Sequence, residues 1–328
     1  MEIAVRNVRL TIEPIYAALA LTALLWSSNF VIGRAVRDDV APVTLNTLRW
    51  AIALAVLLPF AAHDLLACRA VLARHWKLVA LLGLTGIAAF QTLCYVAVTM
   101  TTALNAILLL SLAPLAIVVV AWAGLGERVT RRQCAGLATS LAGATVLVLH
   151  GELAPLLELR FNAGDLLMLL GVTLWAVYSV LLRRRPPEVP PLALHAASVA
   201  AGTLWMLPAF AWQAGQGAAL PAGTGAWLAV GFIAVFSSAL AHALWVRGVA
   251  AIGASRAGVF IHLMPLFGAV LAVTFLGETL GAFHVIGAAL VLCGVALSSR
   301  VPAAGPAAAG AAGAAFAPSD RIGPGRTR

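Results

Sequence analysis

The sequence predicts an all-α polytopic membrane protein with ten transmembrane helices, arranged as two inverted repeats of five helices. Hydrophobic residues make up 62% of the chain and charged residues only 10%, whereas an ordinary soluble protein has roughly 25% charged residues. Two long stretches of the chain repeat each other, and basic residues gather at alternate connections between the apolar segments. These observations predict a duplicated protein that folds within a membrane.

Each helix of the first half is predicted from a run of apolar residues long enough to cross a bilayer, which takes about 20 residues at about 1.5 Å of rise each. A cytoplasmic segment, residues 1–14, precedes the first repeat, which covers residues 15–150. The predicted helices of this repeat lie near residues 15–36, 43–62, 78–98, 104–123 and 134–150.

The second half follows an external linker, residues 151–165, and its repeat covers residues 166–299. A tail of residues 300–328, mostly Ala, Gly and Pro, follows it. That composition cannot bury enough apolar surface to fold, so we expect a disordered cytoplasmic tail. The predicted helices of the second repeat lie near residues 166–182, 192–212, 227–246, 257–276 and 283–299.

The duplication appears as matching residues at nearly constant spacing. In the later part of each half the spacing is 151, and in the earlier part it is 149. We call two residues related by these spacings counterparts. The clearest counterparts are Trp26 and Trp175, Pro42 and Pro191, Pro59 and Pro208, Pro114 and Pro265, Glu127 and Glu278, Gly136 and Gly287, and Gly143 and Gly294.

The positions of the 21 basic residues predict the orientation of the helices. With the N-terminus inside, most of them lie on the cytoplasmic side, and only Arg34, Arg37 and Arg160 lie outside. Five helices per half then require that the two repeats run in opposite directions. Two inverted copies have two nearly equivalent packings, which is the physical basis of alternating access. The alternative is that duplication only built a stable bundle.

Polar residues inside the predicted spans are the candidates for a binding site, because such residues are costly in lipid unless they face a partner or a cavity. All twelve acidic residues fall in loops, tails or helix ends, which argues against a pump that exchanges protons for cations at a membrane carboxylate. Several polar residues have polar counterparts, including Asn29 with Tyr178 and Gln91 with His242. The predicted substrate cavity consists of Trp26, Asn29, Asn46, Arg49, Gln91, Tyr95, Trp175, Tyr178, His242, Trp245 and His262.

Each of these assignments has a structural alternative. Arg49 lies about 10 Å from the outer end of its helix at about 1.5 Å per residue, so it could reach the interface instead of a cavity. His242 and His262 could hydrogen-bond neighbouring helices instead of contacting substrate or relaying protons. Pro114 and Pro265 are candidate hinges, or static kinks that only suit packing.

The fifth helix of each half carries small residues that allow close helix contact, including Gly136, Gly143, Gly287 and Gly294. We expect these two helices to form a scaffold or a homodimer surface and not the pore. The sequence shows no pattern typical of a metal or catalytic site, so no cofactor is expected. Nucleic acid is not an expected partner, because the basic residues follow the helix ends.

Four segments resemble the EamA family of the drug/metabolite transporter superfamily: Leu25–Phe30, Pro42–Arg49, and the two segments at 114–127 and 265–278 that each contain Pro-Leu and Leu-Gly-Glu. The resemblance covers about residues 15–299. It implies a ten-helix inverted-repeat fold with both termini cytoplasmic, in the inner membrane of a bacterium, around a central cavity.

The resemblance also implies that the protein exports amino acids or related small metabolites. The sequence is therefore expected to encode a secondary transporter that works by alternating access on a small-molecule substrate within the lipid bilayer, and not an enzyme. Two alternatives remain from the sequence alone. One is a membrane partner or receptor subunit that does not transport, and the other is an intramembrane enzyme.

Overall fold

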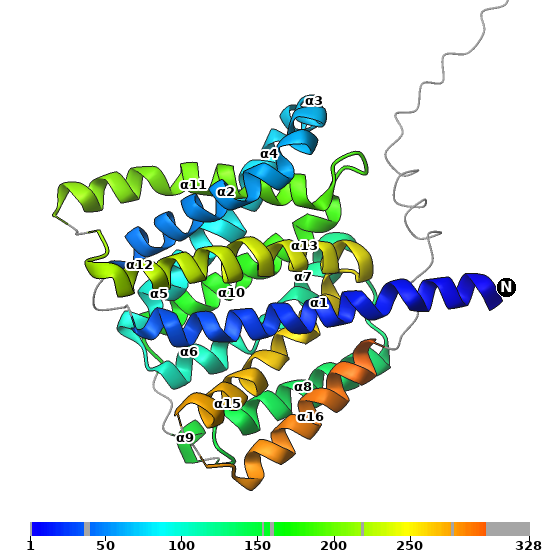
Figure 1. The fold of residues 1–328 in the computed structure, drawn as a ribbon. Helices are drawn as coiled ribbons and strands as arrows, with labels where there is room; N and C mark the ends of the chain where they lie inside the picture. The colour runs from blue at the N-terminus through cyan, green and yellow to red at the C-terminus, as the bar shows by residue number, and fades with distance from the viewer. Residues whose placement is uncertain are drawn as a thin grey trace, which may run out of the picture.

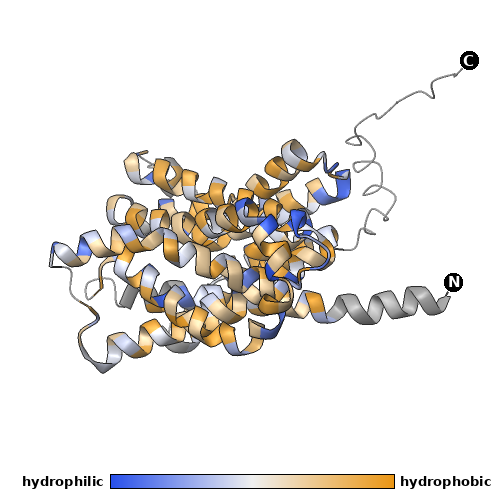
Figure 2. Cartoon of the chain, turned by 90° about the horizontal axis from the view of Figure 1, so that it is seen from above, coloured by the Kyte–Doolittle hydropathy of each residue, from blue (hydrophilic) through white to orange (hydrophobic). Residues whose placement is uncertain are grey.

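The computed structural model describes residues 2–35, 40–152, 154–157, 161–217, 220–276 and 279–299. Helices form nearly all of this described part, and they lie side by side (Figure 1). The predicted tail and part of the predicted linker lie outside the described residues. Hydrophobic residues dominate the length of the helices, and hydrophilic residues gather toward their ends (Figure 2).

The described part of the first half consists of long helices with short helical segments between them. One of the predicted spans, residues 78–98, corresponds to α4, η1 and α5 joined end to end, and η1 is a π-helix. The elements are α1 (Glu2–Ala35), α2 (Pro42–Ala67), α3 (Arg69–Arg74), α4 (Trp76–Leu82), η1 (Gly83–Ala89), α5 (Phe90–Met100), α6 (Ala103–Leu110), α7 (Ala113–Leu125), α8 (Arg131–Val148) and α9 (Ala154–Leu157).

The second half follows the same order, and its π-helix η3 interrupts the span that corresponds to residues 227–246. The elements are α10 (Ala163–Leu181), η2 (Leu182–Arg184), α11 (Pro191–Gly215), α12 (Gly223–Phe232), η3 (Ile233–Leu240), α13 (Ala241–Ile252), α14 (Ala254–Val259), η4 (Phe260–His262), α15 (Leu263–Leu276) and α16 (Ala282–Ser299).

Eight helical stretches of the described chain are long and apolar enough to cross a membrane, and they coincide with eight of the predicted spans. The first and fifth predicted spans coincide with α1 and α8, which are helical but are not among these eight. Helix α1 also continues through Pro14 to Glu2, well before the predicted start near residue 15.

Local sequence signals explain where several helices begin. The counterparts Pro42 and Pro191 are the first residues of α2 and α11, where the fixed φ of proline suits the helix and its missing N–H is not needed. Asn162 accepts a hydrogen bond from the backbone N–H of Asp165, and the Asp165 carboxylate accepts one from the backbone N–H of Asn162. This capping box fixes the start of α10.

Helices α8 and α16 pack against each other through their small residues. A Cβ atom added at Gly136 would lie 2.7 Å from the carbonyl oxygen of Gly294, and one added at Gly143 would lie 2.8 Å from that of Gly287. Positions that ascend in α8 thus meet positions that descend in α16, so the two helices are antiparallel. The small-residue faces that we expected to form a scaffold or a homodimer surface contact each other within one chain.

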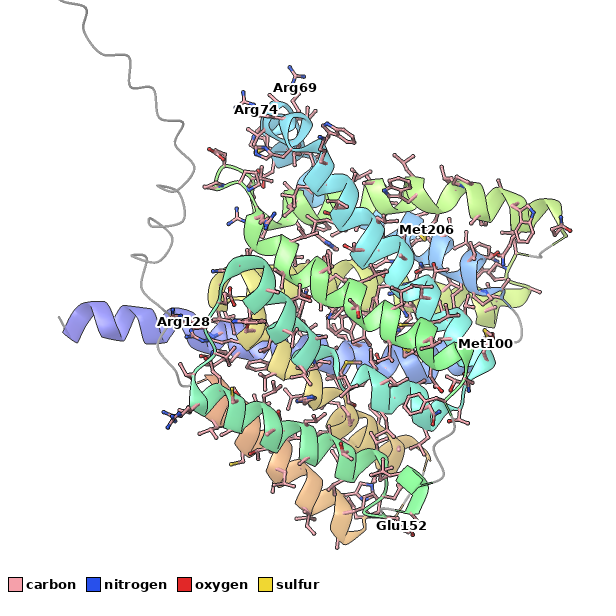
Figure 3. All side chains as sticks on the ribbon, turned by 180° about the vertical axis from the view of Figure 1, so that it is seen from behind. Arg69, Arg74, Met100, Arg128, Glu152 and Met206 are labelled. Carbon is pink, nitrogen blue, oxygen red and sulfur yellow. The ribbon has the colours of Figure 1, made fainter. Side chains whose placement is uncertain are left out.

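The two ends of the molecule differ in charge. Arg69, Arg74 and Arg128 lie toward the end where α1 begins, whereas Met100 and Glu152 lie toward the opposite end (Figure 3). This separation agrees with the distribution of basic residues on which the predicted orientation was based.

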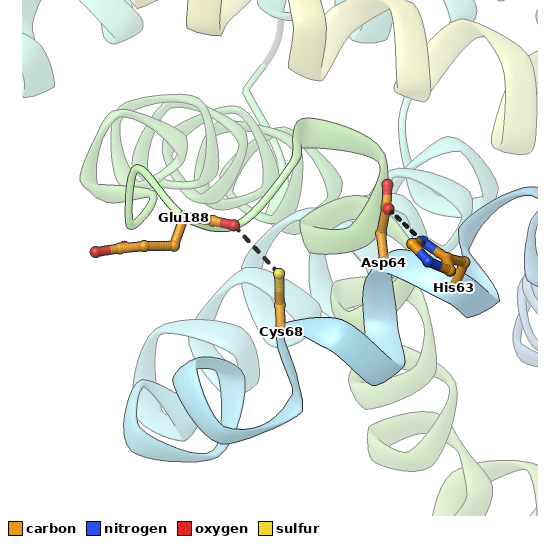
Figure 4. A network of polar contacts seen from close by, with 4 residues as sticks. All are labelled: His63, Asp64, Cys68 and Glu188. Atoms are coloured by element: carbon orange, nitrogen blue, oxygen red, sulfur yellow. Dashed lines mark hydrogen bonds and ion pairs between the residues drawn. The ribbon is translucent and has the colours of Figure 1, made fainter.

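The connection after α2 also lies at the basic end. The Cys68 thiol lies 3.2 Å from the backbone oxygen of Glu188 and donates to it (Figure 4). At the exposed end of α2, Nδ1 of His63 lies 3.2 Å from a carboxylate oxygen of Asp64. The Cys68 contact joins the first half of the chain to the loop before α11.

Candidate functional site

A cavity of about 40 Å³ lies between the two halves of the chain. Such a volume holds a few water molecules, which is less than the space that a metabolite-sized ligand needs. Eleven described residues line the cavity, and they come from both halves: Trp26, Asn29, Arg49, Phe90, Gln91, Leu110, Ala113, Trp175, His242, Ile261 and Met264.

Arg49 lies in the wall of this cavity and is held there by hydrogen bonds. Its side chain is only 1% exposed. Its Nε donates to the Ser238 hydroxyl at 2.8 Å, and its Nη1 donates to the Tyr95 hydroxyl at 2.8 Å. The guanidinium carbon also lies 5.2 Å from the ring centre of Trp50, a distance at which a cation is attracted to an aromatic face. Arg49 therefore points inward, which does not fit the alternative that it reaches the interface.

Aromatic rings form the apolar part of the site. Trp26 and Trp175, which are counterparts, meet edge to face with ring centres 5.2 Å apart. His242 lies against Trp26 at 5.1 Å, and Phe90 lies against Trp175 at 4.9 Å. Such pairs are stable geometries for aromatic rings. The cavity therefore has a rigid aromatic wall beside the buried charge of Arg49.

The π-helices set the positions of Gln91 and His242. Helix η1 ends two residues before Gln91, and η3 ends two residues before His242. A π-helix has one more residue between hydrogen-bonded groups than an α-helix, and short π segments occur often at functional sites. The two π-helices lie at counterpart positions. In both halves, therefore, a π-helical segment directly precedes a polar side chain that lines the cavity, Gln91 in the first half and His242 in the second.

Two polar groups of the site have specific hydrogen-bonding states. Nδ1 of His242 lies 2.8 Å from the carbonyl oxygen of Ser237 and 3.4 Å from Nε1 of Trp26; since a carbonyl oxygen only accepts, the shorter contact favours the tautomer with the proton on Nδ1. The side-chain oxygen of Asn29 is buried and accepts no hydrogen bond within the described part of the chain. Because an unmet buried acceptor is costly, Asn29 is suited to receive a donor from a bound molecule.

Some predicted site residues bind neighbouring helices instead of lining the cavity. Nδ2 of Asn46 lies 3.3 Å from the carbonyl oxygens of Ile87 and Ala88 in η1 and 2.9 Å from the Thr92 hydroxyl. Asn46 thus supports the π-helix. His262 lies with Nε2 2.9 Å from the carbonyl oxygen of Ser111 and Nδ1 2.7 Å from the Ser140 hydroxyl.

The other predicted residues form a shell behind the cavity wall. Tyr95 holds Arg49, as described above. Trp245 packs against Trp26 and Trp175 at 5.4 Å, and Tyr178 packs against Trp175 at 5.1 Å. The Tyr178 hydroxyl and the Trp245 ring nitrogen are buried without a hydrogen-bond partner in the described chain.

The candidate hinges lie where two helices are interrupted. Helix α6 ends at Leu110 and α7 begins at Ala113, next to Pro114. The matching position of the second half holds η4, a short segment of 3-10 helix, directly before α15 and Pro265. These breaks are what a proline near the start of a helix segment favours; a hinge motion at them stays a prediction.

Sequence reasoning missed several residues of the site. Phe90, Leu110, Ala113, Ile261 and Met264 line the cavity, but apolar residues in an apolar span give no signal that separates them from their neighbours. Ser238, which holds Arg49, could have been found, because it is a hydroxyl-bearing residue inside a predicted span.

Polar contacts tie the helices together at both ends of the molecule. At one end, Asp165 of α10 is fully buried and accepts hydrogen bonds from Thr101 at 2.5 Å and from Asn105 at 3.2 Å. At the basic end, the Glu127 carboxylate lies 2.9 Å from the Ser255 hydroxyl and 3.7 Å from the Arg183 guanidinium. Each of these two sets of contacts therefore joins the first half of the chain to the second.

A model of the EamA-like transporter family matches residues 14–149 and again residues 162–300. The chain belongs to the EamA-like transporter family. It is accordingly an integral membrane protein and a transporter, and the relatives that follow are named as transporters too.

Individual relatives of this EamA-family transporter come from bacteria and archaea. The chain is 29% identical over 283 residues to a protein of Streptantibioticus cattleyicolor named as a probable terminal-alkyne amino-acid exporter, covering 86% of this chain and 92% of the relative. It is 28% identical over 283 residues to an uncharacterized transporter of Archaeoglobus fulgidus, covering 86% and 96%. A crystal structure with 25% sequence identity superposes with a TM-score of 0.68, covering 85% of this chain and 95% of the other.

Proposed function

We propose that this EamA-family transporter exports amino acids or related small metabolites by alternating access. The observation that carries the proposal is the cavity between the halves, in which a buried Arg49 and the amides of Asn29 and Gln91 face an aromatic wall. A cation and amide groups suit a carboxylate, and the aromatic wall suits an apolar side chain. The relative named as an amino-acid exporter supports the same substrate class.

The proposed alternating access rests on two inverted repeats of five helices, residues 15–150 and 166–299, joined by an external linker at 151–165. The antiparallel packing of α8 and α16 supports the inversion. Gly136 contacts Gly294, and their counterparts, Gly287 and Gly143, contact each other in the same way. The double match of one family model supports the duplication. The contacts around Asp165 and Glu127, at opposite ends, would close the cavity to either side in turn.

We place the protein in the inner membrane of a bacterium, with both termini and the basic end in the cytoplasm. The charge of Arg69, Arg74 and Arg128 at one end supports this orientation. Labelling with an impermeant maleimide tests it, after the four native cysteines have been replaced by alanine. A cysteine at Arg74 should react only in inside-out vesicles and a cysteine at Gly217 only in right-side-out vesicles; the reverse pattern would contradict the orientation.

Flux of labelled amino acids from proteoliposomes tests the function and the site together. Wild type should release labelled leucine or phenylalanine faster than protein-free liposomes. Arg49→Ala and Gln91→Ala should each slow the release by about tenfold, since one lost charged hydrogen bond is worth about 1.5 to 3 kcal/mol. Arg74→Ala, on the exposed helix α3, is the matched control. Undiminished flux in both cavity variants would refute the site, and no flux of any common amino acid would refute amino-acid export.

A further inference from the structure

The charge of Arg49 has no counter-ion in the described structure. Among the described residues that line the cavity, Arg49 carries the permanent charge and none is acidic. The groups that contact its guanidinium are the Tyr95 and Ser238 hydroxyls and the face of Trp50. All of these are neutral. The described site therefore places a buried cation among neutral, polar groups.

Such an arrangement favours an anion in the cavity. An ion that is removed from water is costly unless an opposite charge and hydrogen bonds compensate for the lost hydration. Hydroxyls use Nε and Nη1 of Arg49, and no described residue accepts from Nη2. A guanidinium presents its N–H groups in a planar fork that matches a carboxylate. A carboxylate at Arg49 would supply both the missing charge and the missing acceptor.

An ammonium group finds no equivalent partner in the same cavity. The acceptors that the lining residues offer are neutral, namely the amide oxygens of Asn29 and Gln91 and a ring nitrogen of His242. The unmet oxygen of Asn29 can accept one hydrogen bond, but it accepts equally well from an ammonium, a hydroxyl or an amide. The site thus has an ion-pair partner for one end of an amino acid and not for the other.

We propose that this cavity recognises apolar monocarboxylates through Arg49, and that the α-amino group of a substrate is dispensable. The inference rests on the proposed function, because it concerns the same cavity. It extends the substrate class from amino acids to the desamino acids with the same side chain. It also excludes the corresponding amines, which would bring a second positive charge next to Arg49.

Equilibrium binding to the purified full-length protein in nanodiscs tests this inference, with intrinsic tryptophan fluorescence as the signal because Trp26 and Trp175 line the cavity. Two matched sets of probes keep the side chain constant. One set is phenylalanine, 3-phenylpropanoate and phenethylamine, and the other is leucine, 4-methylpentanoate and isopentylamine. In at least one set the desamino acid should bind within about threefold of the amino acid, and the amine should bind at least about tenfold more weakly, since it loses a charged hydrogen-bonded pair.

Substitutions of Arg49 test whether this residue is responsible for the binding of the carboxylate. Arg49→Gln should weaken binding of the amino acid and the desamino acid alike, by about tenfold or more, and Arg49→Lys should retain part of the affinity because it keeps the charge without the fork. Ser198→Ala, at the counterpart of Arg49, is the matched control; in the described part of the chain the Ser198 hydroxyl donates to the Leu194 carbonyl of its own helix. Variants that unfold are identified by their melting temperature, and the wild-type probe series then decides alone.

Each result has one meaning. Binding of both acids but not of the amine supports the inference. If an amino acid binds and its desamino analogue does not, or if the amine binds as tightly as the amino acid, the inference is overturned while amino-acid export stands. If none of the six compounds binds, the inference is overturned, and flux of the other common amino acids then decides on amino-acid export.

Discussion

Nε2 of His262 donates a hydrogen bond to the carbonyl oxygen of Ser111 at 2.9 Å, and these two residues are counterparts in the two halves of the chain. Trp26 and Trp175, also counterparts, are in ring contact at 5.2 Å. In a pair of halves related by a two-fold axis, counterparts touch each other only close to that axis. In the inverted-repeat arrangement proposed above, both contacts lie close to such an axis, and one of them is in the wall of the cavity.

Replacing His262 should affect stability more than substrate recognition. Both ring nitrogens of His262 are used, by Ser111 and Ser140, and it is not among the residues that line the cavity. His262→Ala removes the side-chain donor to the Ser111 carbonyl and leaves the buried Ser140 hydroxyl with only its contact to the Leu137 carbonyl among the described residues, so we expect the free energy of unfolding to fall by about 1 to 3 kcal/mol. Thermal unfolding measures this loss. A large change in substrate affinity without a change in melting temperature would contradict it.

Removing the Tyr95 hydroxyl should weaken substrate binding by loosening Arg49. The hydroxyl accepts from Nη1 of Arg49 at 2.8 Å, and a hydrogen bond to a charged group contributes about 1.5 to 3 kcal/mol. Tyr95→Phe should therefore raise the apparent KM for transport by about tenfold. Thr99→Ala, on an exposed face of the same helix, should leave KM unchanged. Equal KM values for wild type and Tyr95→Phe would show that this contact does not position Arg49.

Replacing Asp165 should loosen the end of the molecule that lies away from the basic residues. Its carboxylate caps α10 and accepts from Thr101 and Asn105. Asp165→Ala should destabilise the protein by about 2 kcal/mol or more, since it removes a charged acceptor and part of the capping box. It should also speed the reaction of a cysteine placed at Gln91 with maleimide added from that side. Glu152→Ala, an exposed residue at the same end, is the control, and equal labelling rates would contradict a closing role for Asp165.

A side chain at Gly143 should separate α8 from α16. A Cβ atom there would lie 2.6 Å from the backbone nitrogen of Val291 and 2.8 Å from the carbonyl oxygen of Gly287. Gly143→Ala should therefore lower stability by about 1 to 3 kcal/mol, the usual cost of overpacking. Gly268→Ala in α15 meets nothing within 4 Å and should leave the melting temperature unchanged. Equal melting temperatures for both variants would contradict the tight packing of the two helices.

The sequence predicted which polar residues are buried better than it predicted which of them line the cavity. Asn29, Arg49, Gln91 and His242 do line it, but Asn46 turns to a neighbouring helix. The repeat predicts that counterparts face inward, because both halves keep polar residues only where lipid is avoided. Whether such a residue reaches the cavity depends on a rotation of the helix, which composition does not reveal.

The two π-helices are the part of the fold that the sequence did not signal. Residues 83–89 and 233–240 are apolar and rich in small residues, as are many α-helical segments of the same chain. Apolar length predicts a span but does not say how its hydrogen bonds are spaced. The starts of α2 and α11, by contrast, follow from Pro42 and Pro191, because proline acts on the backbone directly.

Each π turn accommodates one surplus residue. One residue corresponds to about 100° of rotation in a helix with 3.6 residues per turn. If the π-helical segment shifts along the helix by one turn, the residues between its old and new positions rotate about the helix axis. The backbone stays hydrogen-bonded, and the two ends of the helix keep their positions. Gln91 and His242 lie directly after η1 and η3, so such a shift can rotate their side chains about the helix axis without unfolding a helix. The polar groups of the cavity then rearrange without a rigid-body motion of whole helix bundles.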